Sequence, residues 1–548
     1  MPKLITTTAS IARLWPRRFG TNRTIDGRDL RQRPNLNRDH RHPRLAESSA
    51  MTASDVPTRP APVDMSRNPF LTGVFAPQRD EVDAVDLPVS GEIPADLRGS
   101  YLRNGPNMRF DPIGSYVYPI DGDAMVHRIS LDGGRASYRN RFVRTPMVLT
   151  EEAAGHAIWS GITDGYTPSA AEVGDELAGT TRELPDINIV RHGGRLLAMA
   201  EADRPYQLAP EDLATLARTD CDGAMFVGST AHPKIDPSTG EMVLFNYVLE
   251  APYLTWAVVG PDGRAIRTPT PVDGVDAPIM IHDMALTSRY VVLFVCPLIF
   301  DIESVMSGGS LLSWQPRRGT RIALIPRDGT AVRWIDADPF WVWHFANAFD
   351  NPDGSVTVDY VEWTYPGGFS DQPTPAASSL TRAVIRPDAG ITKTVLNSSE
   401  PDMEFPRIDD RMLTREHHRI ASVAKGPRDS GDLDSLWFHD LAAGTETVWT
   451  PGAAIGEPIY IPGAERDYWG AIGTDPTDMT SHFYLLSADA PQDGPIATVD
   501  LPIRVPAGLH GAWLPDPSRR PFASSGAPQG SDGLLPDPER TRAPGSAT

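Results

Sequence analysis

Cysteine is nearly absent from this sequence: Cys221 and Cys296 are the only two in 548 residues. Two thiols so far apart form no disulfide framework, and a reducing cytoplasm is the expected compartment. Long apolar runs are missing too. No stretch reaches the roughly 18 uncharged residues of a membrane-spanning helix. No apolar segment follows the arginine pair in RLWPRRFG (13–20), as an export signal would require.

Positive charge is scarce outside the N-terminus. The net charge is −20, but residues 1–50 carry a balance of +7, so the remainder holds −27. So acidic a body argues against a nucleic-acid partner, because phosphate binding depends on Lys and Arg. We expect a basic disordered leader over 1–66, in which residues 1–50 stem from a misplaced start codon. The folded domain is then 67–516, followed by a low-complexity, disordered tail at 517–548.

Helical periodicity is also scarce, with short candidates only at 210–217 (PEDLATLA) and around 303–312. Short β-rich runs dominate instead. Several are joined by Asp-Gly or Gly-Gly turns typical of hairpins, in LDGGR, PDGR, RDGT and PDGS. A sandwich rarely reaches this length as one unit, whereas a β-propeller grows by blades of about 40–50 residues. Strand density and length therefore favour an all-β propeller.

Four of the thirteen histidines lie in apolar or small surroundings near the ends of expected strands: His232, His282, His344 and His510. The others lie in the leader, by turns, in polar stretches such as REHHR (415–419), or on an alternating strand. A single buried histidine is more often a hydrogen-bonded core residue than a metal ligand. Four in similar settings favour a shared site.

The spacing of these four histidines supports convergence. The gaps of 50, 62 and 166 residues correspond to about one, one and three blades, so the side chains would meet on a propeller axis. Zinc fingers have ligands within a few residues of each other, so this is not a structural zinc site. Imidazole ligands suit Zn, Cu, Fe and Ni alike, which leaves the metal open.

Ligating histidines usually donate their second N–H to a carboxylate. Glu201, Glu404 and Glu457 lie in apolar contexts that suit this role. Each could instead be a strand-end residue bonded to the backbone.

From about Asn68 to Pro515 the chain resembles the carotenoid cleavage oxygenase family. The resemblance is carried by nine motifs in order: GEIPADLRGSYLRNGPN, YPIDGDAMVHRISL, RLLAMAEADRPYQL, GSTAHPKIDPSTGEM, MIHDMALTSRYVVLF, WHFANAF, EFPRIDD, GEPIYIP and IATVDLPIRVPAGLHGAWLP. It implies a seven-bladed β-propeller with Fe2+ on the central axis and a cap of loops and short helices over one face.

The family's iron ligands fall on the same four histidines, and its three carboxylate partners on the same three glutamates. One ligand histidine then lacks a carboxylate. No residue beyond the metal site is expected to be catalytic.

The resemblance implies an iron(II) dioxygenase that cleaves a double bond of a carotenoid or apocarotenoid with O2 to give two carbonyl products. An alternative is a lignostilbene-type enzyme acting on a hydroxylated stilbene. That substrate needs polar partners such as Tyr and Lys, and the folded part has only Lys234, Lys393 and Lys425. A zinc propeller hydrolase and a non-enzymatic scaffold are the remaining alternatives.

One further stretch, PLIFDIESVMSGGSLLSW (297–314), is apolar with only two charges. We expect it to line the entrance of a substrate tunnel and to contact a membrane peripherally. An ordinary buried loop is the competing interpretation.

Overall fold

The computed structural model describes residues 58–119, 121–306, 310–367, 376–398, 402–426 and 433–516. Residues 1–57 of the expected leader and the expected tail at 517–548 lie outside the described residues. Pro62 pairs with Ile113, and Arg59 donates a hydrogen bond to the carbonyl of Ala157 (2.6 Å). Contacts with the body of the protein therefore begin upstream of residue 67, where we placed the start of the domain.

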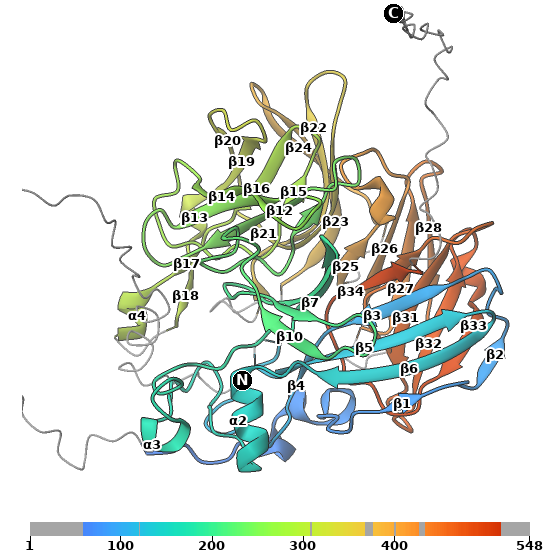
Figure 1. Ribbon diagram of the computed structural model, residues 1–548. Helices are drawn as coiled ribbons and strands as arrows, with labels where there is room; N and C mark the ends of the chain where they lie inside the picture. The colour runs from blue at the N-terminus through green and yellow to red at the C-terminus, as the bar shows by residue number, and fades with distance from the viewer. Residues whose placement is uncertain are drawn as a thin grey trace, which may run out of the picture.

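Seven antiparallel sheets follow one another around a common centre in the described part of the chain, which confirms the predicted seven-bladed β-propeller (Figure 1). The first sheet contains strands from both ends of the chain, in the order β1 (Asp83–Ala84), β6 (Arg135–Phe142), β5 (Asp123–Asp132), β3 (Gly99–Arg103) and β34 (Gly511–Pro515), with β4 (Pro106–Asn107) beside β5.

The second to sixth sheets have four strands each. In order within each sheet they are β10 (Thr215–Arg218), β9 (Tyr206–Leu208), β8 (Arg195–Met199) and β7 (Asn188–His192); β11 (Lys234–Ile235), β12 (Met242–Tyr247), β13 (Leu254–Val259) and β14 (Ala265–Pro271); β15 (Ala285–Leu286), β16 (Tyr290–Val295), β19 (Thr320–Pro326) and β20 (Arg333–Ala337); β21 (Trp341–Asp350), β22 (Val356–Trp363), β23 (Ser378–Arg386) and β24 (Gly390–Val395); β25 (Met403–Arg407), β26 (Arg419–Ala424), β27 (Ser435–Asp440) and β28 (Thr445–Trp449).

The seventh sheet again combines the two ends of the chain. Its strands are β29 (Ala454–Ile455), β31 (Tyr468–Thr474), β32 (Ser481–Ser487), β33 (Pro495–Asp500) and β2 (Val89–Gly91), with β30 (Ile459–Ile461) beside β31. The ring is thus closed twice, by β2 on β33 and by β34 on β3. The second closure, β34 on β3, begins at Gly511, directly after the C-terminal histidine His510.

Turn chemistry accounts for the hairpins that the sequence predicts. In LDGGR, Gly133 and Gly134 have φ of 58° and 80°, and they join β5 to β6 with Asp132 opposite Arg135. Two consecutive residues with positive φ make the tight turn that fits twisted strands, and glycine adopts them without strain.

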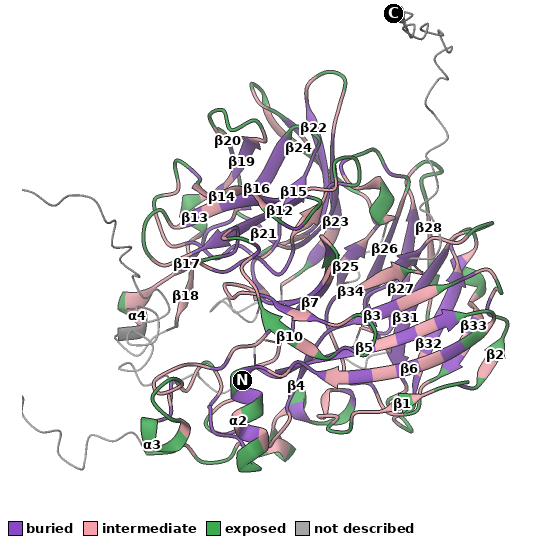
Figure 2. Ribbon diagram, viewed as in Figure 1, coloured by how far each residue is buried: buried purple, intermediate pink, exposed green. Residues whose placement is uncertain are grey.

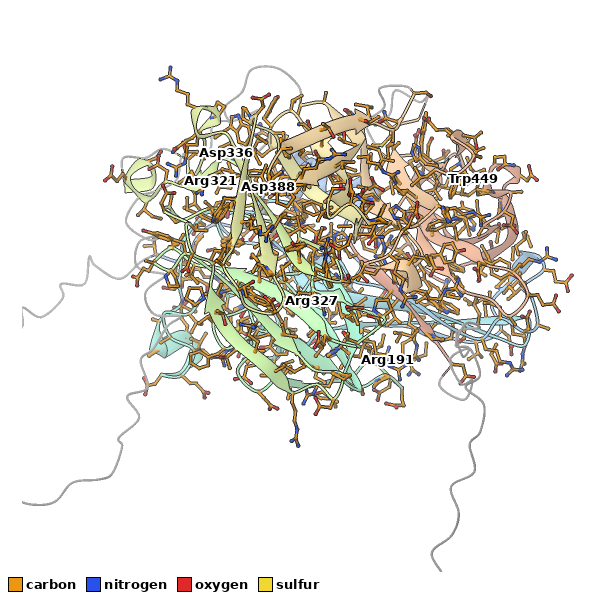
Figure 3. All side chains as sticks on the ribbon, turned by 90° about the horizontal axis from the view of Figure 1, so that it is seen from above. Arg191, Arg321, Arg327, Asp336, Asp388 and Trp449 are labelled. Atoms are coloured by element: carbon orange, nitrogen blue, oxygen red, sulfur yellow. The ribbon has the colours of Figure 1, made fainter. Side chains whose placement is uncertain are left out.

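The hydrophobic core lies between neighbouring sheets, where side chains of one sheet pack on those of the next. Figure 2 shows the strands mostly buried and the connecting loops exposed. At the junction of the first and seventh sheets the Tyr101 and Phe483 rings lie 5.1 Å apart. At the junction of the third and fourth sheets, Arg327 pairs with Asp236 (2.6 Å) and Glu241 (2.5 Å) (Figure 3). The buried carboxylate of Asp236 between these two sheets is therefore paired, as such a position requires.

Among the described residues, helices are few and short. They are α2 (Pro146–Ala154), α3 (Ala170–Val173) and α4 (Ile302–Met306), with single turns of 3-10 helix at η2 (Met65–Arg67), η3 (Pro69–Leu71), η4 (Gly73–Phe75), η5 (Pro316–Arg318), η7 (Asp410–Met412) and η8 (Pro491–Asp493). In the described part of the chain, none is long and apolar enough to cross a membrane. The cap over one face stays a prediction.

One predicted helix is wrong. Residues 210–217 form a turn that runs into β10, because Leu213 has φ of 64° and residues from Thr215 onward pair with β9. Strand pairing overrides the local helix preference. The other candidate, around 303–312, holds the short α4 between β17 (Leu298–Phe300) and β18 (Leu312–Trp314), which form a two-stranded hairpin.

Candidate metal centre

The four candidate histidines are carried by strands that border the centre of the ring. His232 precedes β11 by two residues and His282 precedes β15 by three. His344 lies inside β21, and His510 directly precedes β34. The first three belong to consecutive sheets and the last to the closing strand of the first sheet, so the spacing of about one, one and three blades is the one the sequence indicated.

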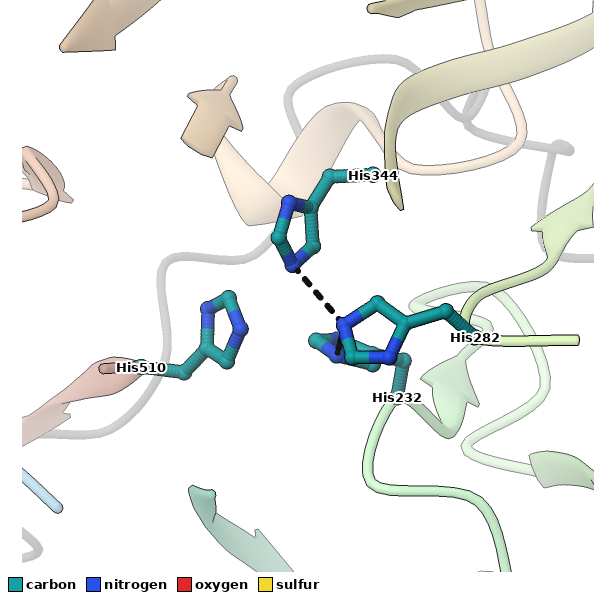
Figure 4. Close-up of side chains that lie close together, drawn as sticks. All are labelled: His232, His282, His344 and His510. Carbon is teal, nitrogen blue, oxygen red and sulfur yellow. Dashed lines mark hydrogen bonds between the residues drawn. The ribbon is translucent and has the colours of Figure 1, made fainter. Parts of the chain in front are cut away.

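The four imidazole rings converge on one point (Figure 4). The Nε2 atom of His282 lies 3.1 Å from Nε2 of His232 and 3.2 Å from Nε2 of His344. One nitrogen from each of the four rings lies within 4.8 Å of all the others. Neighbouring ligands of a single ion are about 3.0–3.4 Å apart when each metal–nitrogen bond is about 2.1 Å. The separations of 3.1 and 3.2 Å therefore fit neighbouring ligands of one metal ion.

Three of the four rings turn their Nδ1 atom to a buried carboxylate. His344 Nδ1 lies 2.5 Å from Glu404 and His510 Nδ1 lies 2.9 Å from Glu457. His282 Nδ1 pairs with Glu201. Because a carboxylate accepts the proton-bearing Nδ1, the Nε2 lone pair is left free to face the centre. This donor set suits a metal ion held by neutral imidazoles.

His232 is held differently, and no carboxylate pairs with it among the described residues. Its backbone N–H donates to the Thr230 hydroxyl (2.9 Å). The resemblance implies one ligand without a carboxylate, and of the four candidates His232 is the one that lacks such a partner in the described part of the chain.

The glutamates are themselves fixed by further hydrogen bonds. The Tyr247 hydroxyl donates to Glu201 (2.6 Å) and the Trp363 indole N–H donates to Glu404 (2.5 Å). The backbone N–H of Gly511 donates to Glu457 (2.9 Å). Each carboxylate therefore has little freedom to turn away from its histidine.

Burial favours the neutral form of two of these rings, His232 and His510. Burial, together with the neighbouring imidazoles, holds the pKa of His232 well below its ordinary value. Burial lowers the pKa of His510 to about 4, against the opposing effect of Glu457. At His282 burial also lowers the pKa, but Glu201 outweighs it and raises the pKa above the ordinary value. Neutral imidazole is the form that binds a metal.

Glu457 stays ionised although it is buried. Burial raises its pKa, but the guanidinium of Arg407 (3.2 Å) and His510 more than offset this and lower the pKa to about 2. A charged carboxylate compensates part of a metal's positive charge that neutral imidazoles leave uncompensated.

Apolar residues adjoin the metal ligands along the chain and pack together. Ala231 and Leu509 immediately precede ligands, and Ala200 precedes a carboxylate partner; with Ile187 they form one buried cluster. Phe405 packs against that cluster and stacks on His344 with ring centroids 5.1 Å apart. Phe405 thus places an apolar ring directly beside two of the candidate ligands, His344 and His510.

Sequence reasoning missed two buried ion pairs, one of them next to a candidate ligand. Asp283 directly follows His282 and pairs with Lys234 (2.8 Å), and both are largely buried. The sequence signal that could have identified Asp283 is the presence of a carboxylate within the largely apolar run MIHDMAL (280–286). The charged context of REHHR indicated polar surroundings for His417, but this residue is only 3% exposed and pairs with Asp359 (3.1 Å).

Several side chains of the apolar stretch 297–314 are buried inside the protein, whereas residues that contact a membrane must be exposed at its surface. Leu298 and Ile299 are at most 7% exposed. Phe300, Leu312 and Trp314 are partly buried against the core of the fourth and fifth sheets. Residues 307–309 lie outside the described residues.

Residues 75–515 match the protein family described as RPE65, retinal pigment epithelial membrane protein. A carotenoid cleavage oxygenase of Mycobacterium tuberculosis is 32% identical, with 82% of this chain and 98% of that protein covered.

Solved structures agree with this match. The lignostilbene dioxygenase of Pseudomonas brassicacearum superposes with a TM-score of 0.73 at 28% identity, covering 83% of this chain and all of that one. A mutant of the Synechocystis apocarotenoid oxygenase gives a TM-score of 0.70, and a cobalt-substituted form of that oxygenase gives 0.68, each at 27% identity and covering 80% of this chain and 97% of the other. The chain therefore belongs to the carotenoid cleavage oxygenase family.

Proposed function

We propose that this protein is an iron(II) dioxygenase that cleaves one carbon–carbon double bond of a carotenoid or apocarotenoid into two carbonyl products. The observation that carries the proposal is the cluster of four buried histidines, His232, His282, His344 and His510, in a member of this oxygenase family. When bound, a ferrous ion with four neutral ligands keeps positions open and supplies the redox chemistry that O2 requires.

The protein's own residues would hold and orient the substrate rather than exchange protons with it. Splitting an alkene by adding both atoms of O2 consumes no proton and releases none. Phe405, whose ring centroid lies 5.1 Å from that of His344 and 5.2 Å from that of His510, is an apolar side chain directly beside the four histidines. An apolar neighbour of this kind suits a hydrocarbon double bond. We therefore assign no general acid or base.

The surroundings of the lysines favour a polyene over a hydroxylated stilbene. A phenol would need a polar partner near the metal, and Lys234 is engaged by Asp283 at 2.8 Å. Lys393 pairs with Glu362 and Lys425 with Asp402, both at 2.8 Å. A stilbene substrate nevertheless remains the second candidate, since a lignostilbene dioxygenase is among the similar structures.

The test combines metal analysis with a substrate panel. Protein purified without oxygen should contain about one iron per chain, whereas zinc would favour a hydrolase. The iron-loaded enzyme is then incubated with carotenoids, apocarotenoids and hydroxystilbenes under isotopically labelled O2. Labelled aldehydes or ketones from a polyene support the proposal, and products from stilbenes alone favour the second candidate. Iron without turnover of any panel member contradicts both.

We also propose a cytoplasmic enzyme that contacts a membrane peripherally through described residues of 297–314. Because Leu298 and Ile299 are buried, the proposal is confined to Leu311 and Leu312, which are partly exposed. A double Leu311→Glu, Leu312→Glu variant should lose co-sedimentation with liposomes. Val395→Glu, at an apolar residue 58% exposed on β24, is the matched control. Equal sedimentation of both variants and the wild type would contradict the contact.

A further inference from the structure

Asp283 is a buried carboxylate that makes three hydrogen bonds or ion pairs without facing the candidate metal. It is only 4% exposed. Its Oδ1 atom pairs with Lys234 Nζ at 2.8 Å and accepts the N–H of Met284 at 2.6 Å. Its Oδ2 atom accepts the backbone N–H of Phe345 at 2.9 Å. Both oxygens are therefore used.

The three chain segments that Asp283 joins each contain a different candidate histidine. Lys234 follows His232 by two residues, on β11 of the third sheet. Asp283 itself follows His282, just before β15 of the fourth sheet. Phe345 follows His344 within β21 of the fifth sheet. One carboxylate therefore links the ligand-bearing segments of three consecutive sheets, between which no continuous strand pairing runs.

The strand that carries His344 is irregular at the point of contact. The pairing of β21 with β22 shifts register on both sides of Phe345. Such bulges redirect a side chain, and they persist where neighbouring groups hold them. The bond from Phe345 N–H to Asp283 fixes the irregular segment relative to the adjacent sheet.

His232 depends on this linkage more than the others do, because it has no carboxylate of its own. Its segment is held by the Thr230 hydroxyl, through the backbone N–H of His232, and by the ion pair of Lys234 with Asp283, whose side chains are 16% and 2% exposed. Removing one partner of a buried ion pair leaves an uncompensated charge and moves the remaining partner.

We propose that Asp283 is a positioning residue that sets the spacing of His232, His282 and His344 before a metal binds. The inference rests on the proposed metal-binding function. It predicts weaker metal binding and altered ligand geometry when Asp283 changes, although none of the metal's ligands is removed. Outer partners of metal ligands are typically worth 10–100-fold in metal affinity.

The test uses Co2+ alone, titrated into metal-free full-length protein and followed by its visible absorption. Asp283→Asn keeps the shape of the side chain but removes the charge opposite Lys234. We expect its Kd for Co2+ to rise about 10–100-fold, with a shifted absorption band. Lys234→Gln attacks the same ion pair from the other side and should raise the Kd in the same direction.

Asp236→Asn is the matched control. Asp236 is also buried and pairs with Arg327 between the third and fourth sheets, but its contacts adjoin no ligand. It should lower the melting temperature of the metal-free protein while leaving the Co2+ Kd and spectrum unchanged.

Three outcomes overturn the inference. Wild-type affinity and spectrum in Asp283→Asn would do so. If that variant fails to fold, unchanged Co2+ binding by Lys234→Gln would do so. Equal losses of Co2+ affinity in Asp283→Asn and Asp236→Asn would show that the loss follows from lower protein stability and not from the linkage through Asp283. Failure of the wild type to bind Co2+ would instead contradict the proposed function itself.

Discussion

The two sides of the candidate metal centre are built in different ways. On one side, His232, His282 and His344 come from three consecutive sheets and are linked through Asp283. On the other, His510 stands alone at the start of β34, the last strand of the ring. It is positioned by backbone pairing, with its N–H on the carbonyl of Ile187 at 3.1 Å.

The difference shows how a ring of sheets secures a central site. Besides the carboxylates that pair with His282 and His344, the segments on the three-histidine side are linked through Lys234, Asp283 and Phe345, which lie within two residues of the histidines in sequence. The His510 side is held by the closure of the ring, in which β34 pairs with β3 more than 400 residues earlier. The first arrangement should respond to local side-chain changes, and the second to anything that disturbs closure.

The largest expected effect comes from removing one ligand on each side. His344→Ala and His510→Ala should each lower iron content by more than the roughly 10–100-fold that loss of an outer partner costs. Both variants should still fold, because Glu404 keeps its hydrogen bond from the Trp363 indole and Glu457 keeps its ion pair with Arg407. Iron per chain is measured by mass spectrometry after anaerobic purification.

His156→Ala serves as the control for that pair, since this histidine is exposed and distant in sequence from all four. Full iron content in either ligand variant would remove that residue from the centre. Loss on one side alone would mean that the two sides do not serve a common ion.

A smaller effect should follow from disturbing closure alone. A Cβ atom at Gly511 would lie 2.3 Å from the Leu102 carbonyl oxygen, on the strand that β34 pairs with. Gly511→Val should therefore push the two strands apart, at a cost of about 1–3 kcal/mol in the free energy of unfolding. Because the Gly511 N–H also holds Glu457, metal affinity should fall as well. Thermal melting and Co2+ titration measure the two effects.

Gly444→Ala is a suitable comparison for Gly511→Val. Gly444 lies in an exposed turn with φ of 64°, where a Cβ atom meets nothing within 4 Å. Alanine there costs about 1–2 kcal/mol of backbone strain but leaves the metal affinity unchanged. If Gly511→Val also melts lower without losing metal affinity, closure does not position His510.

The contrast between the two sides also explains what the sequence could predict. The all-β class follows from short runs and turn signals, and the four histidines stood out by their apolar contexts. Closure could not be derived from local patterns, because pairing of β2 with β33 joins segments about 400 residues apart. The linkage through Asp283 could not be derived either, because it joins three segments that are separated in sequence and become neighbours only in the folded protein. At 210–217 local preference predicted a helix where pairing with β9 imposes a strand.

The smallest effect concerns Asp186, which precedes the residue that holds the His510 backbone. It is 1% exposed, and neither carboxylate oxygen has a hydrogen-bond partner among the described residues. Burial, with the nearby carboxylates of Asp121 and Asp123, raises its pKa well above the ordinary value. The side chain thus holds its proton in the folded protein at pH values where the unfolded chain has lost it, near pH 4 and above.

Folding then takes up a proton between the two pKa values, so the stability of the wild type falls as pH rises through that window. The slope is at most about 1.4 kcal/mol per pH unit for one group. Asp186→Asn carries no charge and removes this dependence. It should therefore raise the melting temperature, and by more at pH 8 than at pH 5. Asp388→Asn, at an exposed aspartate on the fifth sheet (Figure 3), should give the same small change at both pH values. If the gain in melting temperature at pH 8 is no greater than at pH 5, ionisation of the buried Asp186 carboxyl does not lower the stability of the folded protein on the His510 side.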